Sequence, residues 1–358
     1  MSAPSTALER HAPPRFCHIP AVGGCIGEAP DDFVVDEIPL YEASGSGQHL
    51  FVRVRKRSMT TPELCHAVAR AAGVNERDIG YAGLKDRHAV TTQWLSLPAA
   101  GVDPERWDLP DGVEVLAVRL HENKLRTGHL AANAFDIRVV GAGEGGAERA
   151  GAVVAFLIEQ GVPNYFGPQR FGGGGTNLAA ALDWARAGLP RTRRFKAKLW
   201  PSVLQAEVFN RYLTSRLALG TDRLLDGEVV RLDRTTRWFV VDDPEKERPR
   251  LHARDVHLTG PVFGPRAPRA ARRGAALELA ALGELELSDA DLARLGKLAP
   301  GTRRDLFMRP TGAAIEPGVD ASFRVCFSLP AGGYATQVIG EITGTPDPRR
   351  SSDARGRP

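Results

Sequence analysis

Cysteine and long apolar runs are both scarce in this chain, and their scarcity excludes several classes of protein. The 358 residues include only four cysteines, and no two of them have C-x-x-C spacing: Cys17, Cys25, Cys65 and Cys326. A disulfide framework or a zinc ribbon is therefore disfavoured, and we expect reduced thiols. No apolar segment approaches the roughly 20 residues of a membrane-spanning helix, and the polar N-terminus lacks the apolar core of a secretion signal. We expect a cytoplasmic protein without membrane contact.

Motifs for metals and nucleotide cofactors are missing as well. The histidines are scattered, without an H-E-x-x-H motif or a Cys/His cluster. The glycine run at residues 172–175 precedes a predicted helix, and bare amides at a helix start attract anions. The run lacks the Lys-Ser/Thr of a phosphate-binding loop and the acidic residue of a dinucleotide fold. We expect no metal and no nucleotide cofactor, and at the glycines a tight turn near another backbone or an RNA phosphate.

What the chain has is an ordinary globular composition with a small excess of positive charge. Hydrophobic residues make up 42% and charged residues 25%, which is enough for a buried core, and the length suggests two domains. The formal net charge is +4, and basic residues crowd into segments 191–198 and 266–273. Such charge suits the phosphates of a nucleic acid, although any one basic run is also typical of a solvated face.

Periodicity predicts a mixture of helices and strands between two polar tails, residues 1–20 and 344–358. The segment 240–320 is rich in Arg, Pro and Ala and has weaker periodicity, which indicates an insert. The predicted strands lie at 33–38, 48–55, 79–82, 90–97, 113–118 and 135–140, with strand-like character over 323–342. The predicted helices lie at 62–72, 148–160, 177–187 and 201–219.

Two of these helices have both ends marked. Thr61 is a plausible N-cap with Pro62 in the first helical position, and Gly73 suits the position after the last turn. Asn177 and Gly188 would cap the third helix in the same way.

Asp86 lies in a loop between two β-rich runs, where side chains are presented rather than packed. An aspartate in a Gly-containing turn is usually part of the turn's own chemistry. Here Lys85, Arg87 and His88 flank it, and nearby cations keep a carboxylate ionised, which is the form needed for nucleophilic attack. The residues alone leave both interpretations open.

Several separated motifs occur in the order found in one known family. They are GLKDRHAVTTQW (83–94), KLR (124–126) with NAF (133–135), NYFG (164–167) with QRFG (169–172), and LPAGGYAT (329–336). An N-terminal signature, DFVV with Glu37, Gly45, Gly47 and His49, and Phe209, Asn210 and Arg216 match as well. With these motifs the chain resembles the TruD family of tRNA pseudouridine synthases.

The resemblance implies an α+β fold. A pseudouridine-synthase-like mixed, largely antiparallel sheet with flanking helices would form a discontinuous catalytic domain from residues 21–160 and 309–343. A family-specific α/β insertion domain would occupy residues 161–308. The two tails would lie outside both domains.

The resemblance also implies an activity and its site. The chain would isomerise uridine, at position 13 in the D arm of tRNA, to pseudouridine without a cofactor or metal. Asp86 would be the catalytic nucleophile, and Asn133 would orient Asp86 or the target base. Phe135 would stack under the uracil, with a core strand position as the alternative, and Tyr334 would form another wall of the pocket.

Two positions depart from the family pattern. Gly27 stands where a Lys is often found, and Gly340 stands where an Arg commonly precedes the Glu. If those basic side chains help to bind RNA, other cations must replace them, and Lys85 and Arg126 are the candidates.

Two alternatives remain beside a tRNA-modifying enzyme. One is a non-catalytic RNA-binding or RNA-folding protein on the same scaffold. The other is a glycosidase-like hydrolase, which would need a second carboxylate across the scissile bond, and the sequence offers none beside Asp86. We favour a monomer, although the sequence leaves the oligomeric state open.

Overall fold

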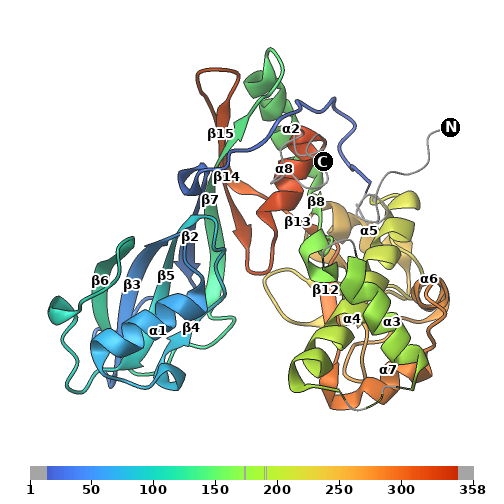
Figure 1. The fold of residues 1–358 in the computed structure, drawn as a ribbon. Coiled ribbons are helices and arrows are strands. Elements are labelled where there is room, and N and C mark those ends of the chain that lie inside the picture. The colour runs from blue at the N-terminus through green and yellow to red at the C-terminus, as the bar shows by residue number, and fades with distance from the viewer. Residues whose placement is uncertain (1–13, 173–174, 189, 191, 346–358) are drawn as a thin grey trace. The chain divides into compact units, whose positions relative to one another are not determined.

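The computed structural model describes residues 14–172, 175–188, 190 and 192–345, and it divides the chain into two compact units (Figure 1). The sheet unit comprises Cys17–Gln160 and the described residues from Arg309 onward. The inserted unit comprises Gly161–Met308 and the described residues before Cys17. Within these ranges, no helix combines the length and apolarity needed to cross a bilayer. Most of both predicted tails lies outside the described residues.

A nine-stranded sheet forms the sheet unit, with strand order β14-β15-β7-β2-β5-β3-β6. Strand β1 pairs with β7, and β4 pairs with β5. Only the β2–β5 pairing is parallel among the described strand pairs of this sheet. The α+β prediction with a largely antiparallel sheet is confirmed. The strands are β1 (Cys25–Ile26), β2 (Phe33–Pro39), β3 (His49–Arg57), β4 (Gly80–Tyr81), β5 (Val90–Pro98), β6 (Val113–His121), β7 (Leu130–Val140), β14 (Thr311–Pro317) and β15 (Phe323–Pro330).

Helix α1 (Thr61–Ala72) covers one part of this sheet. Alternating residues of β3, among them Val52 and Val54, pack with Leu64 and Val68 of the helix. The N-cap is Thr60 rather than the predicted Thr61. Thr60 is extended, and its side chain accepts a hydrogen bond from the Glu63 backbone N–H. The Glu63 carboxylate in turn accepts one from the Thr60 backbone N–H, which is a capping box.

The register carries the same buried face across the sheet to β7 and β15. Directly paired residues of neighbouring strands project from one face, and Val35 pairs with both Thr91 and Phe135, which in turn pairs with Phe327. Helix α2 (Gly146–Gln160) contacts β14 and helix α8 (Ala335–Thr343). On the central strands this buried face also carries polar residues, among them Glu37, Lys56 and Gln93.

The segment that follows β15 is a helix, so the prediction of strand-like character over 323–342 is wrong in its second half. Ala335, Val338, Ile339 and Ile342 are buried at i, i+3, i+4 and i+7. This spacing lines one side of a helix, but a short apolar run does not distinguish helix from strand by composition.

The inserted unit holds its own antiparallel sheet, β10-β9-β11-β12, and the two-stranded pair β13-β8. Its core is one cluster built around helix α4. The strands are β8 (Val162–Pro163), β9 (Val229–Leu232), β10 (Trp238–Val240), β11 (Val256–Val262), β12 (Thr302–Asp305) and β13 (Phe307–Met308). The helices are α3 (Thr176–Arg186), α4 (Arg194–Ala218), α5 (Pro244–His252), α6 (Arg272–Gly283) and α7 (Asp289–Leu295).

Two helix starts in this unit differ from prediction. Helix α3 is preceded by Gly175 in the left-handed region, with φ of 80°, so Asn177 lies inside the helix and not at its cap. Helix α4 begins at Arg194, and Pro201 lies within it. A proline removes one backbone hydrogen bond, but the packed core around α4 outweighs that local loss.

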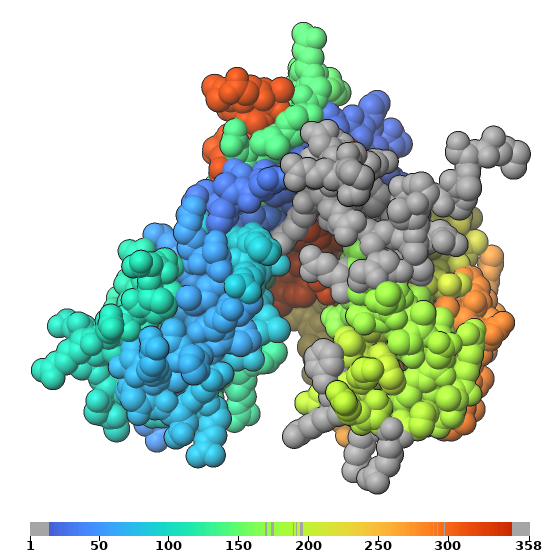
Figure 2. All heavy atoms as spheres, in the orientation of Figure 1, coloured from blue at the N-terminus to red at the C-terminus, as the bar shows by residue number. Residues whose placement is uncertain are grey.

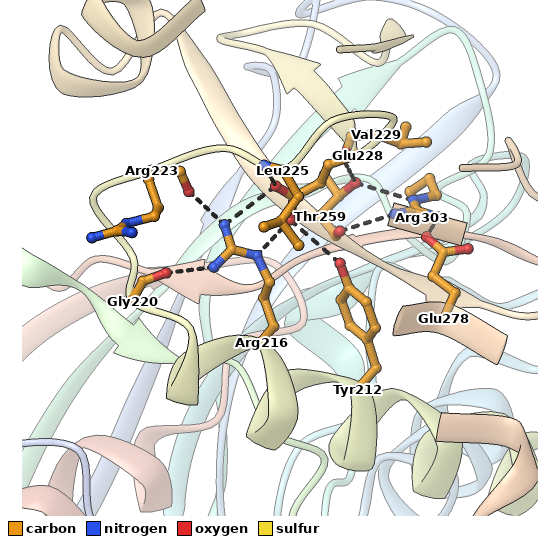
Figure 3. Close-up of polar contacts among 10 residues, drawn as sticks. All are labelled: Tyr212, Arg216, Gly220, Arg223, Leu225, Glu228, Val229, Thr259, Glu278 and Arg303. Atoms are coloured by element: carbon orange, nitrogen blue, oxygen red, sulfur yellow. Dashed lines mark hydrogen bonds and ion pairs between the residues drawn. The ribbon is translucent and has the colours of Figure 1, made fainter. Parts of the chain in front are cut away.

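Buried charges connect α4 to the inserted sheet (Figure 3). Arg216 Nε lies 2.7 Å from Glu228 Oε1, with each side chain 1% exposed. Arg216 also donates to the Arg223 carbonyl at 2.6 Å and to the Gly220 carbonyl, while the Leu225 N–H donates to Glu228. Every charge is therefore matched by hydrogen bonds, which a buried ion pair needs to be stable.

We expect Glu228→Gln to destabilise the inserted unit by about 3–5 kcal/mol, because it leaves the Arg216 guanidinium buried without a counter-charge. The exposed pair Arg248–Glu245 supplies the control, and Glu245→Gln should cost about 0–1 kcal/mol. Urea unfolding of the two variants measures the difference. Equal stabilities for the two variants would contradict a structural role for the buried pair.

Candidate active site around Asp86

The loop that carries Asp86 joins β4 to β5 and is held at its centre by Lys85. The Lys85 backbone N–H donates to Thr61 Oγ1 at 2.9 Å, and Thr61 Oγ1 donates to Gln93 Oε1 at 2.9 Å. Thr61 is the first residue of α1, so the loop is attached at the helix end that favours negative charge. Lys85 is buried and Asp86 beside it is exposed. The aspartate is therefore presented from a fixed backbone.

The Lys85 side chain ends in a buried ion pair. Its Nζ lies 3.0 Å from Glu37 Oε2, and the two side chains are only 4% and 1% exposed. The other carboxylate oxygen of Glu37 accepts a hydrogen bond from the Trp94 backbone N–H at 3.2 Å. Since both charges are out of water, removal of either would leave the other buried and unpaired.

Asn133 completes this group, which we call the Lys85 cluster (Glu37, Lys85 and Asn133). Glu37 and Asn133 are direct register partners on β2 and β7. Lys85 Nζ donates to Asn133 Oδ1 at 2.5 Å. An ammonium group can only donate, so the amide oxygen of Asn133 faces Lys85 and its NH₂ group faces away. The lysine thereby decides which end of the amide is available to a substrate or to Asp86.

A second buried lysine holds the backbone of Asp86 itself. Lys56, fully buried near the end of β3, donates to the Asp86 carbonyl at 3.0 Å and to the Met59 carbonyl. Burial lowers the pKa of Lys56 to about 8, the Asp86 carboxylate opposes this shift, and the Lys85 ammonium adds to it. Asp86 therefore lies within electrostatic reach of a lysine that can lose its proton in the physiological range.

Phe135 lies on the same face of β7 as Asn133, two residues further along. Its ring stacks on Phe327 with centroids 5.4 Å apart and meets Phe33 edge-on at 6.2 Å. The residue is 8% exposed. Phe135 is therefore a core strand residue, and only a small part of its ring is open to a substrate base.

Tyr334 follows the end of β15 and precedes α8. Leu329 pairs with Asn133, and the Ala331 N–H donates to the Ala131 carbonyl at 3.2 Å, so the strand leaves the sheet just beyond this row. Tyr334 then occupies the N-cap position of α8 and is half-buried.

Arg126 is exposed on the loop between β6 and β7, which packs beside the Asp86 loop. The Gly128 N–H donates to the Ala82 carbonyl at 2.8 Å. The close approach requires Gly80, because a Cβ there would lie 2.2 Å from the Leu125 carbonyl oxygen. Arg126 is thus available at the surface, unlike Lys85.

The structure brings together Asp86, Lys85 and Asn133, all predicted site residues, but it gives Lys85 a different environment. The sequence predicts Lys85 as an RNA contact, whereas its ammonium is engaged by Glu37 and Asn133. Sequence reasoning missed Glu37 and Lys56 as part of the site. Both lie in the buried phase of an alternating strand, in step with Val35 and Val54, and a charge in that phase is a signal of a buried pair.

Gly27 has a structural counterpart in Asp32. A Cβ at position 27 would lie 2.2 Å from Asp32 Oδ2, so the aspartate fills the space where the family often has the start of a Lys side chain. Arg138 forms an ion pair with this aspartate, with Nη1 3.6 Å from Asp32 Oδ1, which the sequence alone did not indicate.

Among the described residues, no three His, Cys, Asp or Glu side chains are grouped so that they could hold a metal ion. The four cysteines, all within the described residues, form no disulfide, and Cys17 and Cys65 are buried.

Comparisons with known proteins agree on one family. The family described as tRNA pseudouridine synthase D (TruD) matches residues 14–178 and 176–342. A tRNA pseudouridine synthase D of Anaeromyxobacter dehalogenans is 43% identical over 91% of this chain and 94% of its own. A Thermus thermophilus protein of that name is 36% identical over 90% of each chain. The crystal structure of a Methanosarcina mazei protein described as a TruD shares the fold, with a TM-score of 0.70, 21% identity and coverage of 92% and 95%.

We expect Lys85→Met to lower the free energy of unfolding by about 3–5 kcal/mol, because the Glu37 carboxylate stays buried without its partner. The double variant Lys85→Met/Glu37→Leu removes both charges and should be more stable than Lys85→Met alone. Urea unfolding measures both. Glu114→Gln, which breaks the exposed Arg55–Glu114 pair, is the control and should cost about 0–1 kcal/mol. A double variant less stable than the single one would contradict this account of the ion pair.

Proposed function

This chain belongs to the tRNA pseudouridine synthase D (TruD) family, and we propose that Asp86 is the nucleophile with which it converts uridine to pseudouridine in tRNA. The chain is a tRNA pseudouridine synthase, an isomerase. The observation that carries the assignment of Asp86 is its loop, which exposes the carboxylate while Lys85 and Lys56 fix the backbone on either side.

The reaction rearranges one nucleotide without adding or removing atoms. The bond from uracil N1 to ribose C1′ breaks, the base turns over, and a bond from C5 to C1′ forms. C5 then loses a proton and N1 gains one. A carboxylate can assist by forming a covalent adduct with the sugar or with the base while the two are separated. In our proposal Asp86 supplies this carboxylate.

The surroundings of Asp86 suit this task. A nucleophile must be held within about 3–3.5 Å of the atom that it attacks. Hydrogen bonds from Lys56 to the Asp86 carbonyl and from the Lys85 N–H to Thr61 restrict the backbone on both sides of its Cα. The carboxylate therefore needs to adjust only its own side-chain torsions.

Asn133 is the polar partner in our proposal. Because its oxygen accepts from Lys85, its NH₂ group is free to donate to the Asp86 carboxylate or to a uracil carbonyl. Lys85 acts through Asn133 and Glu37 as a positioning residue and does not touch the RNA.

The remaining predicted residues surround the base and the backbone of the RNA. We assign Phe135, which is 8% exposed, to the uracil ring, with Tyr334 as another wall, and exposed Arg126 to an RNA phosphate. Base–aromatic contact holds any base in a sequence-tolerant way, and a cation on phosphate fixes register without reading sequence.

We place the target at uridine 13 in the D arm, as the resemblance to the family implies. We also propose that the protein works in the cytoplasm and as a monomer.

Asp86→Asn should lower the rate of pseudouridine formation at least about 10⁴-fold, because an amide is not a nucleophile of carboxylate strength. The Kd for tRNA should stay within about threefold. Chemical labelling of pseudouridine and filter binding measure the two quantities. Asp111→Asn, at an exposed aspartate of the same unit, should leave both unchanged. Full activity of Asp86→Asn would refute the assignment, and release of free uracil would indicate a hydrolase instead.

Lys56→Met should reduce kcat about tenfold or more with a smaller change in KM, because the Asp86 backbone loses its donor and small misplacements are costly. In the wild-type protein the rate should decline as the pH rises through about 8, where Lys56 loses its proton. Stability changes in the opposite direction. Because burial lowers the folded-state pKa of Lys56 from 10.5 to about 8, the protonated lysine costs stability at lower pH, and this cost disappears as the pH rises from about 8 to 10.5.

The pH profile of kcat provides the decisive comparison. Lys56→Met should lack the decline near pH 8, and circular dichroism checks that the variant is folded. An unchanged profile in the variant would show that Lys56 does not act on the Asp86 loop.

A further inference from the structure

Leu84 is an exposed apolar side chain close to the proposed nucleophile, and it contributes little to the buried core. It is 69% exposed and lies two residues before Asp86. Isolated exposed leucines need no explanation on most surfaces. This one is set apart by its place in the loop that carries the proposed nucleophile, with buried Lys85 between the two.

The exposure of Leu84 is built into the loop. Residues 84, 85 and 86 alternate exposed, buried and exposed, and the buried member is fixed by its backbone bond to Thr61 and by its ion pair with Glu37. On the other side of Leu84, the Ala82 carbonyl accepts from the Gly128 N–H at 2.8 Å. Turning Leu84 inward would require breaking these contacts, so the loop presents an apolar group and a carboxylate side by side.

Their closeness along the chain allows both to act on one nucleotide. Residues two apart have Cα atoms at most about 7 Å from each other, so Leu84 and Asp86 can reach neighbouring parts of the same substrate. A base must leave the stack before an enzyme can act at C1′ or on the ring. Unstacking leaves a hole between the neighbouring bases, and proteins that distort nucleic acids fill such holes with apolar side chains, Leu among them.

We propose that Leu84 enters the space vacated by the target uridine and stabilises the extruded state while Asp86 attacks. This inference rests on the proposed function, because it takes Asp86 as the reacting group. Leu84 is then a residue that contacts the substrate, and its contribution is to base extrusion and not to bond rearrangement.

The test compares single-turnover rates of Leu84→Ala, Leu84→Met and the wild-type protein on the same tRNA transcript. Without the Leu84 side chain, the single-turnover rate of Leu84→Ala should fall about tenfold or more. Leu84→Met keeps an apolar group of similar length, and its rate should stay within about threefold of the wild-type rate. Val319→Ala is the matched control, since Val319 is 74% exposed in the turn between β14 and β15. It should behave as wild type.

A second readout isolates extrusion from chemistry. In the Asp86→Asn background, a transcript with 2-aminopurine next to the target uridine reports loss of stacking as a rise in fluorescence on binding. The rise should be lost or much slower when Leu84→Ala is added, with the Kd for tRNA changed less than about threefold.

The outcomes separate this inference from the proposed function. A wild-type rate for Leu84→Ala, or an unchanged fluorescence rise, would overturn the proposed role of Leu84 even if Asp86→Asn is inactive. An active Asp86→Asn variant would overturn the nucleophile regardless of Leu84.

Discussion

The Asp86 loop depends on one buried interaction, the ion pair between Lys85 and Glu37. The charged form of a lysine whose side chain is 4% exposed needs a carboxylate partner. The register of β2 against β7 places Glu37 opposite Asn133 and beside the Lys85 ammonium. The same register places Asn133 where its oxygen accepts from Lys85. Sheet pairing, burial and side-chain orientation are therefore coupled. A slip of one residue in β2 would turn Glu37 to the other face of the sheet and leave the ammonium alone.

Figure 2 shows the surface of the chain in the orientation of Figure 1.

The two units solve the problem of buried charge in the same physical way but with different consequences. In the inserted unit, Arg216 and Glu228 are surrounded by backbone partners on every side (Figure 3). That network connects a helix to a sheet and leaves nothing exposed. In the sheet unit, the Lys85 cluster lies directly beneath an exposed aspartate, and Asn133 keeps an amide group that the lysine does not use. One network lies within a core, and the other holds the backbone of the Asp86 loop in place.

Much of the fold was predictable, and the misses have local physical causes. Alternation in β3 and the marked end at Gly73 located a strand and a helix, because periodicity and left-handed glycine are strong local signals. Thr60 and Thr61 are both able to cap, and only the structure shows that Thr61 instead bonds to the Asp86 loop. For the candidate site, the motif around Asp86 directed attention to this loop, but no periodicity applies inside a loop, so the burial of Lys85 could not be predicted. Glu37 and Lys56 could have been found, since each places a charge in the buried phase of a strand.

The most direct test of the central claim is a crystal structure of the Asp86→Asn variant bound to its tRNA. The account predicts that the side chain at position 86 lies within about 3.5 Å of C1′ or of the ring of the extruded uridine. It also predicts that Lys85 still lies between Glu37 and Asn133. A target uridine bound elsewhere on the chain, or a side chain at position 86 directed away from it, would contradict the account.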